Sequence, residues 1–210
     1  MSVKTRLYPV LVPAQYASLL RRRRVTLRGP VVLEPKFDGY LVAAIGGKLY
    51  NVLGEPAPRW LKAALFMAGV AEQVYEMMRD GFAVFLEVYG RRLTPNGYHR
   101  KHKRDYDAVV LDIGIVEDGR VRILPPEKAA DAADIYGLRY VPYRFEDADV
   151  LTDPPMSLAE RLPAYQGWEG YVAKVYAAHG HRLPPDYRVK QLGVLMVKAR
   201  WQSLGNLVVH

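Results

Sequence analysis

A lysine between two apolar runs is the first residue of this sequence whose placement suggests chemistry. Lys36 belongs to the stretch Glu34–Gly39, which follows the run Val31–Leu33 and precedes the run Leu41–Ile45. An ammonium group is costly to desolvate without a partner, and the same desolvation makes a lysine usable as a nucleophile at neutral pH. The alternative is a Lys-Asp pair on the rim of a hairpin, which these few residues taken alone would favour.

Charged residues also interrupt apolar, strand-like runs later in the chain. Together with Lys36 they are Glu87, Asp112, Glu169, Lys174, Lys198 and Arg200. One such residue is often a satisfied buried pair, whereas several on different strands indicate a polar cleft between sheets. The set contains both positively and negatively charged side chains. Its lysines and arginine can neutralise a transferring phosphoryl group, and its carboxylates can hold a divalent metal or a ribose hydroxyl.

A basic segment with interleaved aromatic residues, Gly90–Tyr106, follows the run that carries Glu87. One interpretation is a mobile, solvated loop. We favour a second, in which the loop holds a nucleic-acid backbone, because cations and stacking aromatics are the groups that such a strand requires. The residues that we expect to bind the strand are Arg100, Lys101, Lys103 and Arg104.

Hydrophobic patterns predict the elements that must position these residues. Glycine-containing pairs, Gly46–Gly47 and Asp118–Gly119, predict tight hairpins. Residues at steps of four and three predict one helix from Pro58 to Arg79, capped by Gly81, and a shorter helix covers Glu127–Tyr136. The buried face of the longer helix is predicted to consist of Trp60, Ala64, Met67, Ala71, Val74 and Met78. Strands are predicted at 31–33, 41–45, 82–89, 108–116, 121–123, 170–176 and 194–199.

The order of these elements is rich in strands with inserted helices and does not alternate as in βαβ units. It predicts an α+β fold with antiparallel sheets, flanking helices and a central cleft. The 210 residues suffice for one sizeable core or two small ones.

Composition narrows the function classes. A net charge of +8 favours a polyanionic partner. The absence of cysteine excludes disulfides, thiolate zinc sites and cysteine nucleophiles. The sequence has no apolar run of membrane-spanning length and no signal-peptide core, so we expect a cytoplasmic protein without a membrane partner.

Four stretches, in order and rough spacing, resemble the motifs of the covalent nucleotidyltransferases. They are Lys36–Gly39, Phe85–Gly90, Glu169–Lys174 and Met196–Arg200. This superfamily comprises ATP-dependent DNA ligases, RNA ligases and mRNA capping enzymes, and the resemblance spans about residues 31 to 200. The Glu-Val-Tyr-Gly form of the second motif and the stretch Val110–Ile113 look more like RNA ligases, which favours RNA over DNA as the partner.

The resemblance implies a mechanism. Lys36 would attack the α-phosphorus of ATP and form a lysyl-AMP intermediate, and AMP would pass to a 5′-phosphate end that a 3′-hydroxyl then seals. Lys174 and Lys198 would be catalytic cations, assisted by Mg²⁺ or Mn²⁺ held by Glu169. The implied nucleotide-binding residues are Glu34 beside the adenine, Glu87 near the ribose, Lys36, Lys174, Lys198 and Arg200.

The sequence departs from the family pattern in three places. Leu41 stands where the family often has a basic or amide residue, and Asn51–Gly54 occupies the place of an expected arginine. The aromatic that stacks on adenine would fall near Leu111. The candidate replacements are Arg59 or Lys48 for the arginine and Tyr106 for the aromatic.

Only Trp201–His210 follow the last motif. We therefore expect a single nucleotidyltransferase domain over residues 1–210 without a C-terminal OB-fold, with a homodimer or a helper domain as alternatives for the missing part. An ATP-dependent RNA ligase is the first interpretation. A capping-type guanylyltransferase and a non-catalytic nucleic-acid-binding relative are the others.

Overall fold

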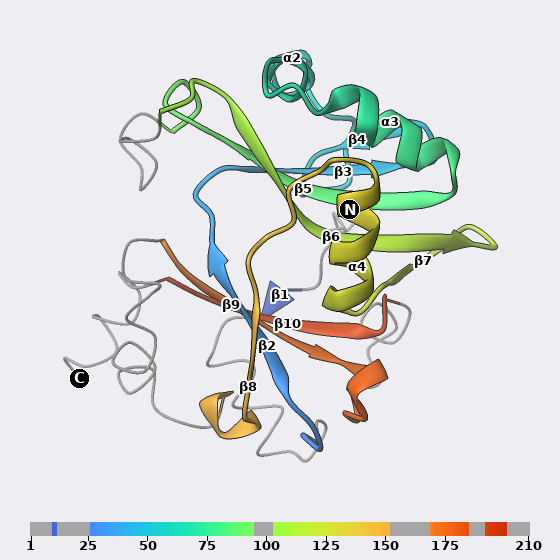
Figure 1. Cartoon of the computed structure of the whole chain (residues 1–210), viewed down its shortest axis with the longest axis vertical. Helices are drawn as coiled ribbons and strands as arrows, with labels where there is room; N and C mark the ends of the chain where they lie inside the picture. The colour runs from blue at the N-terminus through green and yellow to red at the C-terminus, as the bar shows by residue number, and fades with distance from the viewer. Residues whose placement is uncertain (1–9, 12–25, 95–102, 152–168, 185–191, 201–210) are drawn as a thin grey trace, which may run out of the picture. The chain divides into compact units, whose positions relative to one another are not determined.

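Two five-stranded sheets organise the part of the chain that the computed structural model describes, namely residues 10–11, 26–94, 103–151, 169–184 and 192–200 (Figure 1). The first unit contains Asp38–Val141, and the second contains Pro9–Phe37 and Pro142–His210. The expectation of one nucleotidyltransferase domain over residues 1–210 stays a prediction. No helix within the described residues combines the length and apolarity needed to cross a membrane.

The sheet of the first unit is entirely antiparallel, with the strand order β4-β3-β5-β6-β7. Its strands are β3 (Tyr40–Ile45), β4 (Lys48–Tyr50), β5 (Phe82–Tyr89), β6 (Asp107–Glu117) and β7 (Arg120–Ile123). Both predicted hairpins are confirmed: φ is 57° and 77° at Gly46 and Gly47, and 49° and 72° at Asp118 and Gly119. Positive φ at both central residues matches the right-handed twist of the flanking strands.

Three helices cover one face of this sheet: α2 (Arg59–Met67), α3 (Ala71–Arg79) and α4 (Pro126–Ile135) (Figure 1). Alternate strand residues such as Val42, Leu86 and Val110 face the helices and form one core with Leu65 and Met77. Within each strand, the residues that alternate with these point to the other side of the sheet. We call that side the face opposite the helices.

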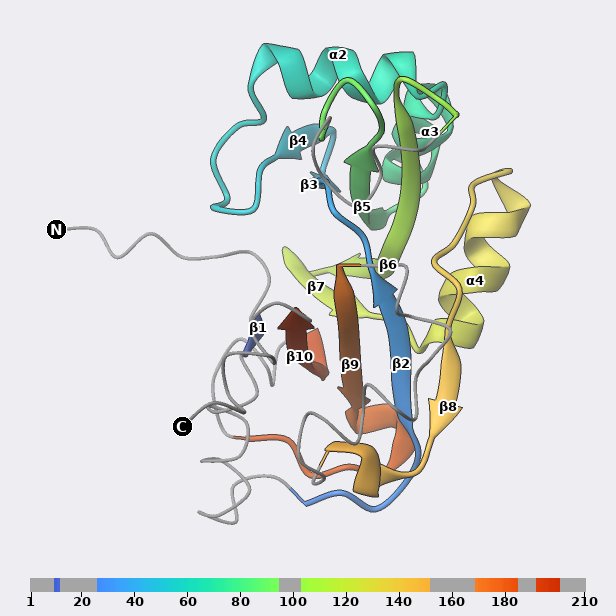
Figure 2. The same ribbon diagram turned by 90° about the vertical axis from the view of Figure 1, so that its left-hand side faces the viewer.

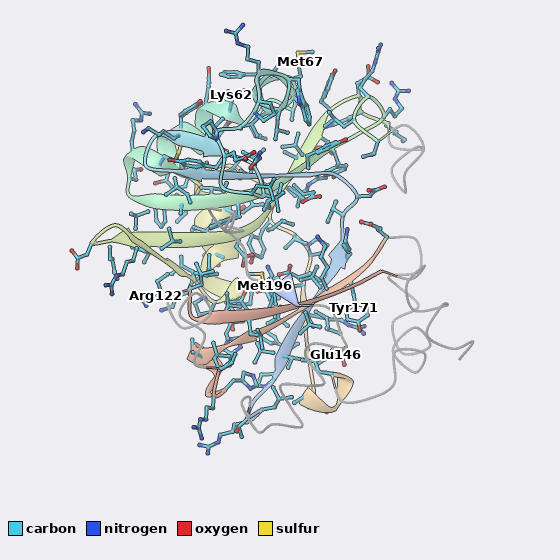
Figure 3. All side chains as sticks on the ribbon, turned by 180° about the vertical axis from the view of Figure 1, so that it is seen from behind. Lys62, Met67, Arg122, Glu146, Tyr171 and Met196 are labelled. Atoms are coloured by element: carbon cyan, nitrogen blue, oxygen red, sulfur yellow. The ribbon has the colours of Figure 1, made fainter. Side chains whose placement is uncertain are left out.

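The predicted single helix from Pro58 to Arg79 is wrong, because it is interrupted between α2 and α3. Gly69 takes φ of 76° just after α2, and this left-handed residue ends the helix and changes the direction of the chain. The buried residues of α2 are Leu61, Ala64 and Leu65, so Trp60 and Met67 are exposed, at 49% and 68%. The predicted core positions Ala64, Ala71, Val74 and Met78 are buried. Figure 3 shows Met67 pointing away from the sheet.

The second unit has the strand order β1-β10-β9-β2-β8, in which β1 is parallel to β10 and the other neighbours are antiparallel. Its strands are β1 (Val10–Leu11), β2 (Val31–Lys36), β8 (Arg144–Glu146), β9 (Gly170–Tyr176) and β10 (Val194–Arg200). Figure 2 shows β9, β2 and β8 side by side. The predicted α+β class with antiparallel sheets and flanking helices is confirmed.

A buried histidine fastens the segment that leads into β2. Nδ1 of His181 accepts a hydrogen bond from the backbone N–H of Arg28 at 3.2 Å, and Nε2 lies 2.8 Å from the carbonyl oxygen of Pro30. Thr26 and Arg182 exchange two backbone hydrogen bonds of 3.0 Å beside it. These contacts fix the position of β2 and therefore of the residues at its far end.

Candidate nucleotide site

Strand alternation collects the charges of the second unit on one face of its sheet. Residues directly opposite one another on neighbouring strands point to the same side. Between β2 and β9, Lys36 is opposite Gly170, Glu34 is opposite Val172, and Val32 is opposite Lys174. Between β9 and β10, Val172 is opposite Lys198, and Lys174 is opposite Met196. We call the side that carries Glu34, Lys36, Lys174 and Lys198 the charged face.

Lys36, the last residue of β2, is buried together with Glu169. Its Nζ donates to Oε2 of Glu169 and lies 3.2 Å from the carbonyl oxygen of Phe37. Lys36 is 5% exposed and Glu169 is 7% exposed, although 133 residues separate them in sequence. Gly170, which directly follows Glu169, stands opposite Lys36 in the register of β2 and β9. The predicted buried lysine therefore has a carboxylate partner from another strand segment.

A second buried pair joins Glu34 to Lys174. The two residues are diagonal neighbours across β2 and β9, and Nζ of Lys174 lies 2.7 Å from Oε1 of Glu34. Each residue is 1% exposed. Burial raises the pKa of Glu34 above its usual range, and the Lys174 ammonium opposes that shift.

Lys198 completes the charged face from β10. It is half-buried and lies diagonally across from Lys174, so two cations stand on adjacent strands. Arg200 is opposite Gly170 in the register, but its side chain lies outside the described part of the structure.

Glu87 belongs to the first unit, on the face opposite the helices. It is half-buried and lies directly across from Leu41 on β3 and Val109 on β6. Asp112 shares that face and is fully buried opposite Phe85, next to a bulge that displaces Leu111 from the register. The predicted cleft between the sheets stays a prediction.

The Asp-Gly half of the first motif packs closely against β5. A Cβ atom at Gly39 would lie 2.5 Å from the carbonyl oxygen of Val88 and 2.9 Å from Cγ of Glu87. The hydroxyl of Thr94 donates to the carbonyl oxygen of Asp38 at 3.3 Å. Glycine is required at position 39 because the backbone approaches the strand that carries Glu87.

The structure also describes the places where the family pattern is absent. The Asn51 side-chain oxygen accepts hydrogen bonds from the N–H groups of Leu53 at 2.9 Å and Glu55 at 3.1 Å, so it builds a turn. Tyr106, the candidate for stacking on adenine, packs against the core beneath the helices.

Of the residues predicted to bind a strand, Lys103 and Arg104 are exposed, whereas Arg100 and Lys101 lie outside the described residues. Sequence reasoning did not single out Arg139, which the structure places beside the base of the same loop. The signal available for it was weak, because Arg139 follows Gly137 in an irregular segment.

No protein-family model and no curated protein matches this sequence. Solved structures do match. An archaeal ATP-dependent RNA ligase has a TM-score of 0.54 and 19% identity, over 81% of this chain and 43% of that chain. Two variants of the Naegleria gruberi RNA ligase with AMP and Mn have TM-scores of 0.61 and 0.62 and 12% identity, over 98% of this chain and 59% of theirs.

This chain therefore spans about half the length of the proteins that it matches. At these identities the likeness concerns the fold, and the resemblance seen in the sequence motifs is confirmed at that level. The chain has a fold similar to that of these RNA ligase structures.

Proposed function

We propose that this chain is an ATP-dependent polynucleotide ligase of the RNA-ligase kind that works through a lysyl-AMP intermediate. The observation that carries the proposal is Lys36, buried beside Glu169 on a sheet face that also holds Lys174 and Lys198. Buried nucleophilic lysines are used in covalent catalysis, and cations on the same face suit a phosphate substrate. RNA is the favoured strand, and a homodimer or a helper domain is the proposed source of any further contacts.

In the first step the deprotonated Nζ of Lys36 attacks the α-phosphorus of ATP. A nitrogen–phosphorus bond forms, the bond from the α-phosphorus to the bridging oxygen breaks, pyrophosphate leaves with that electron pair, and the nitrogen releases a proton. Lys174 and Lys198 offset the charge that builds on the α-phosphate oxygens. Such an in-line displacement depends mainly on positioning and on charge neutralisation.

In the later steps a 5′-phosphate oxygen of the strand attacks the phosphorus of lysyl-AMP. The nitrogen–phosphorus bond breaks, and Lys36 recovers a proton. A 3′-hydroxyl then attacks the 5′-phosphorus, loses its proton and displaces AMP. In this scheme Glu34 contacts the adenine, Glu87 contacts a ribose hydroxyl, and Arg200 contributes to nucleotide binding.

The residues present fit a magnesium ion that arrives with the nucleotide. Within the described residues no group of three or more acidic or histidine side chains could hold a metal alone. Magnesium is usually bound through one or two carboxylates together with substrate phosphates and water, and Glu169 supplies one buried carboxylate. When bound, the ion would offset phosphate charge.

Covalent labelling tests the proposal. Wild-type protein incubated with ATP labelled at the α-phosphate and with Mg²⁺ should carry label through denaturing electrophoresis, and acid should release it because a nitrogen–phosphorus bond hydrolyses in acid. Lys36→Ala and the charge-conserving Lys36→Arg should both lose the adduct. Lys62→Ala, at an exposed lysine of α2, is the matched control and should keep it (Figure 3).

An unlabelled wild type, or an undiminished adduct in Lys36→Ala, would remove the proposal. Labelling with GTP in preference to ATP would instead indicate a guanylyltransferase.

A non-catalytic nucleic-acid-binding relative is the second candidate, and one observation favours it. Leu41 places an apolar side chain directly across from Glu87, where the family often has a polar residue. Transfer of AMP from the labelled protein to a 5′-phosphorylated strand would exclude this candidate.

A further inference from the structure

Four arginines converge on two aspartates where β5 ends and β6 begins, within the first unit. We call this set the arginine cluster. It consists of Arg91, Arg92, Arg104 and Arg139 with Asp105 and Asp107.

The backbone beneath the cluster is pinned at both ends of the basic segment. Gly90 takes φ of 132°, and a Cβ there would clash with the carbonyl oxygen of Asp105. The N–H groups of Arg91 and Arg92 donate to the carbonyl oxygens of Arg104 at 3.3 Å and Asp105 at 3.2 Å. The two ends of the segment are thus held together, so the arginines do not need to be assembled by a ligand.

Asp105 is an exposed carboxylate between two of the arginines. Oδ1 accepts from Nη2 of Arg91 at 2.6 Å, and Oδ2 lies 3.6 Å from Nε of Arg92. The hydrogen bond from Arg91 lowers the pKa of Asp105, so this carboxylate is ionised at neutral pH.

Asp107 is a buried carboxylate that orients the other two arginines. Oδ1 accepts from its neighbour's backbone N–H at 2.8 Å and lies 3.7 Å from Nη1 of Arg104. Oδ2 accepts from Nη2 of Arg139 at 3.0 Å, and the same Nη2 donates to the hydroxyl of Tyr89. Burial raises the pKa of Tyr89 to about 12, so its hydroxyl stays neutral.

The Arg139 side chain is 53% exposed and makes its polar contacts through one nitrogen. Every hydrogen bond and ion pair that its guanidinium group makes within the described part of the chain uses Nη2. Nε and Nη1 therefore remain as further N–H donors, each of which can donate a charge-assisted hydrogen bond to a phosphate oxygen.

The cluster has more positive charge than its carboxylates need. Each aspartate has two arginines within 4 Å, and the arginine side chains are 53% to 70% exposed. Exposed ion pairs are weak because water and salt screen them, so a second arginine per aspartate adds little stability. The cluster also lies beside the proposed nucleotide contacts, because Tyr89 follows Glu87 by two residues on the same face, about 7 Å along β5.

We propose that the arginine cluster is a binding site for the phosphate backbone of a single-stranded polynucleotide. The cluster holds the strand by charge and by guanidinium–phosphate hydrogen bonds, without reading its bases. That the bound polynucleotide is the strand to be joined rests on the proposed ligase function.

The test is binding of a fluorescent single-stranded RNA without a 5′-phosphate, in the absence of ATP and over a range of salt concentrations. Arg92→Gln/Arg104→Gln removes two exposed guanidinium groups whose carboxylate contacts are the long ones. Affinity at about 0.1 M salt should fall roughly tenfold or more, and the slope of log K against log salt should decrease by about 0.7 per lost phosphate contact. Arg139→Gln should lower the slope by about one contact, with thermal unfolding used to confirm that it is folded.

The matched control is Arg120→Gln/Arg122→Gln, which removes the same charge from β7. There β7 pairs with the end of β6 that lies about 30 Å along the strand from Asp107. This control should leave both affinity and slope nearly unchanged. Single-stranded DNA of the same sequence should show the same losses in the cluster variants, because the phosphates are shared.

Equal losses in the cluster and control variants would overturn the proposal, as would a wild type that does not bind RNA. A cluster variant with weakened ATP binding but normal RNA binding would assign these arginines to the nucleotide instead. Since no ATP is present in the RNA assay, failure of Lys36 labelling would contradict the ligase function and leave this result intact.

Discussion

The two units of this chain use opposite charges in different ways. In the second unit, Lys36 pairs with Glu169 and Lys174 pairs with Glu34, and the two pairs are almost fully buried. Lys198 is a third, half-buried cation on the charged face. In the arginine cluster of the first unit, each aspartate has two arginines, and all four guanidinium groups are largely exposed.

Burial accounts for the difference. Burying an ion pair costs the free energy of removing both charges from water, so the pair is stable only if its geometry is good. Such a pair therefore fixes the position of its side chains. An exposed excess of arginine costs little and attracts a polyanion over a distance set by screening. The first arrangement suits covalent chemistry on one phosphorus atom, and the second suits retention of a long strand.

The largest expected effect comes from breaking one buried pair. Lys174→Met should lower the free energy of unfolding by about 3–5 kcal/mol because Glu34 would be left buried without a counter-charge. Replacing both partners, in Glu34→Leu/Lys174→Met, should restore most of the loss, because a matched apolar pair has no charge to desolvate. Urea unfolding of the wild type, of Lys174→Met, of Glu34→Leu and of the double variant forms a double-mutant cycle, which gives the interaction free energy of the pair. A double variant as unstable as the sum of the singles would contradict this account of the charged face.

A smaller effect is expected at the base of the arginine cluster. Gly90→Ala places a side chain at φ of 132° and against the carbonyl oxygen of Asp105. It should lower the free energy of unfolding by about 1–3 kcal/mol, and by more if the two ends of the loop separate. Gly47→Ala is the matched control, because φ there is 77° and a Cβ meets no atom within 4 Å. It should cost only about 1 kcal/mol. Equal costs by urea unfolding would show that the loop ends are not held together at Gly90.

Local sequence patterns predict the part of this structure that depends on near neighbours. Apolar runs interrupted by a single charge predict β5 and β9, and paired glycines predict the hairpin at Gly46. The broken helix was missed because the apolar period continues across Gly69, whose positive φ is what ends α2. The charged residues of the site were found because each interrupts an apolar strand.

Pairings between distant residues could not be predicted in the same way. Nothing local indicates that Lys36 meets Glu169, since strand register over 133 residues decides it. Arg139 was missed for a related reason, because it lies in an irregular segment and its role depends on a contact with Asp107.

The smallest expected effect separates the two regions by the sign of a pH dependence. Burial raises the pKa of Glu34, so the folded state binds a proton that the unfolded state releases, and this contribution to stability is present below about pH 4.5 and lost as pH rises. The unfolding free energy of wild type minus that of Glu34→Gln should therefore fall with increasing pH, by at most about 1.4 kcal/mol per pH unit. Asp105 behaves oppositely, because the hydrogen bond from Arg91 lowers its pKa and its contribution is lost as pH falls. Wild type minus Asp105→Asn should rise with pH in the acid range, and urea unfolding from pH 2.5 to 7 measures both differences. Curves of the same sign would show that burial does not distinguish the carboxylate of the charged face from that of the arginine cluster.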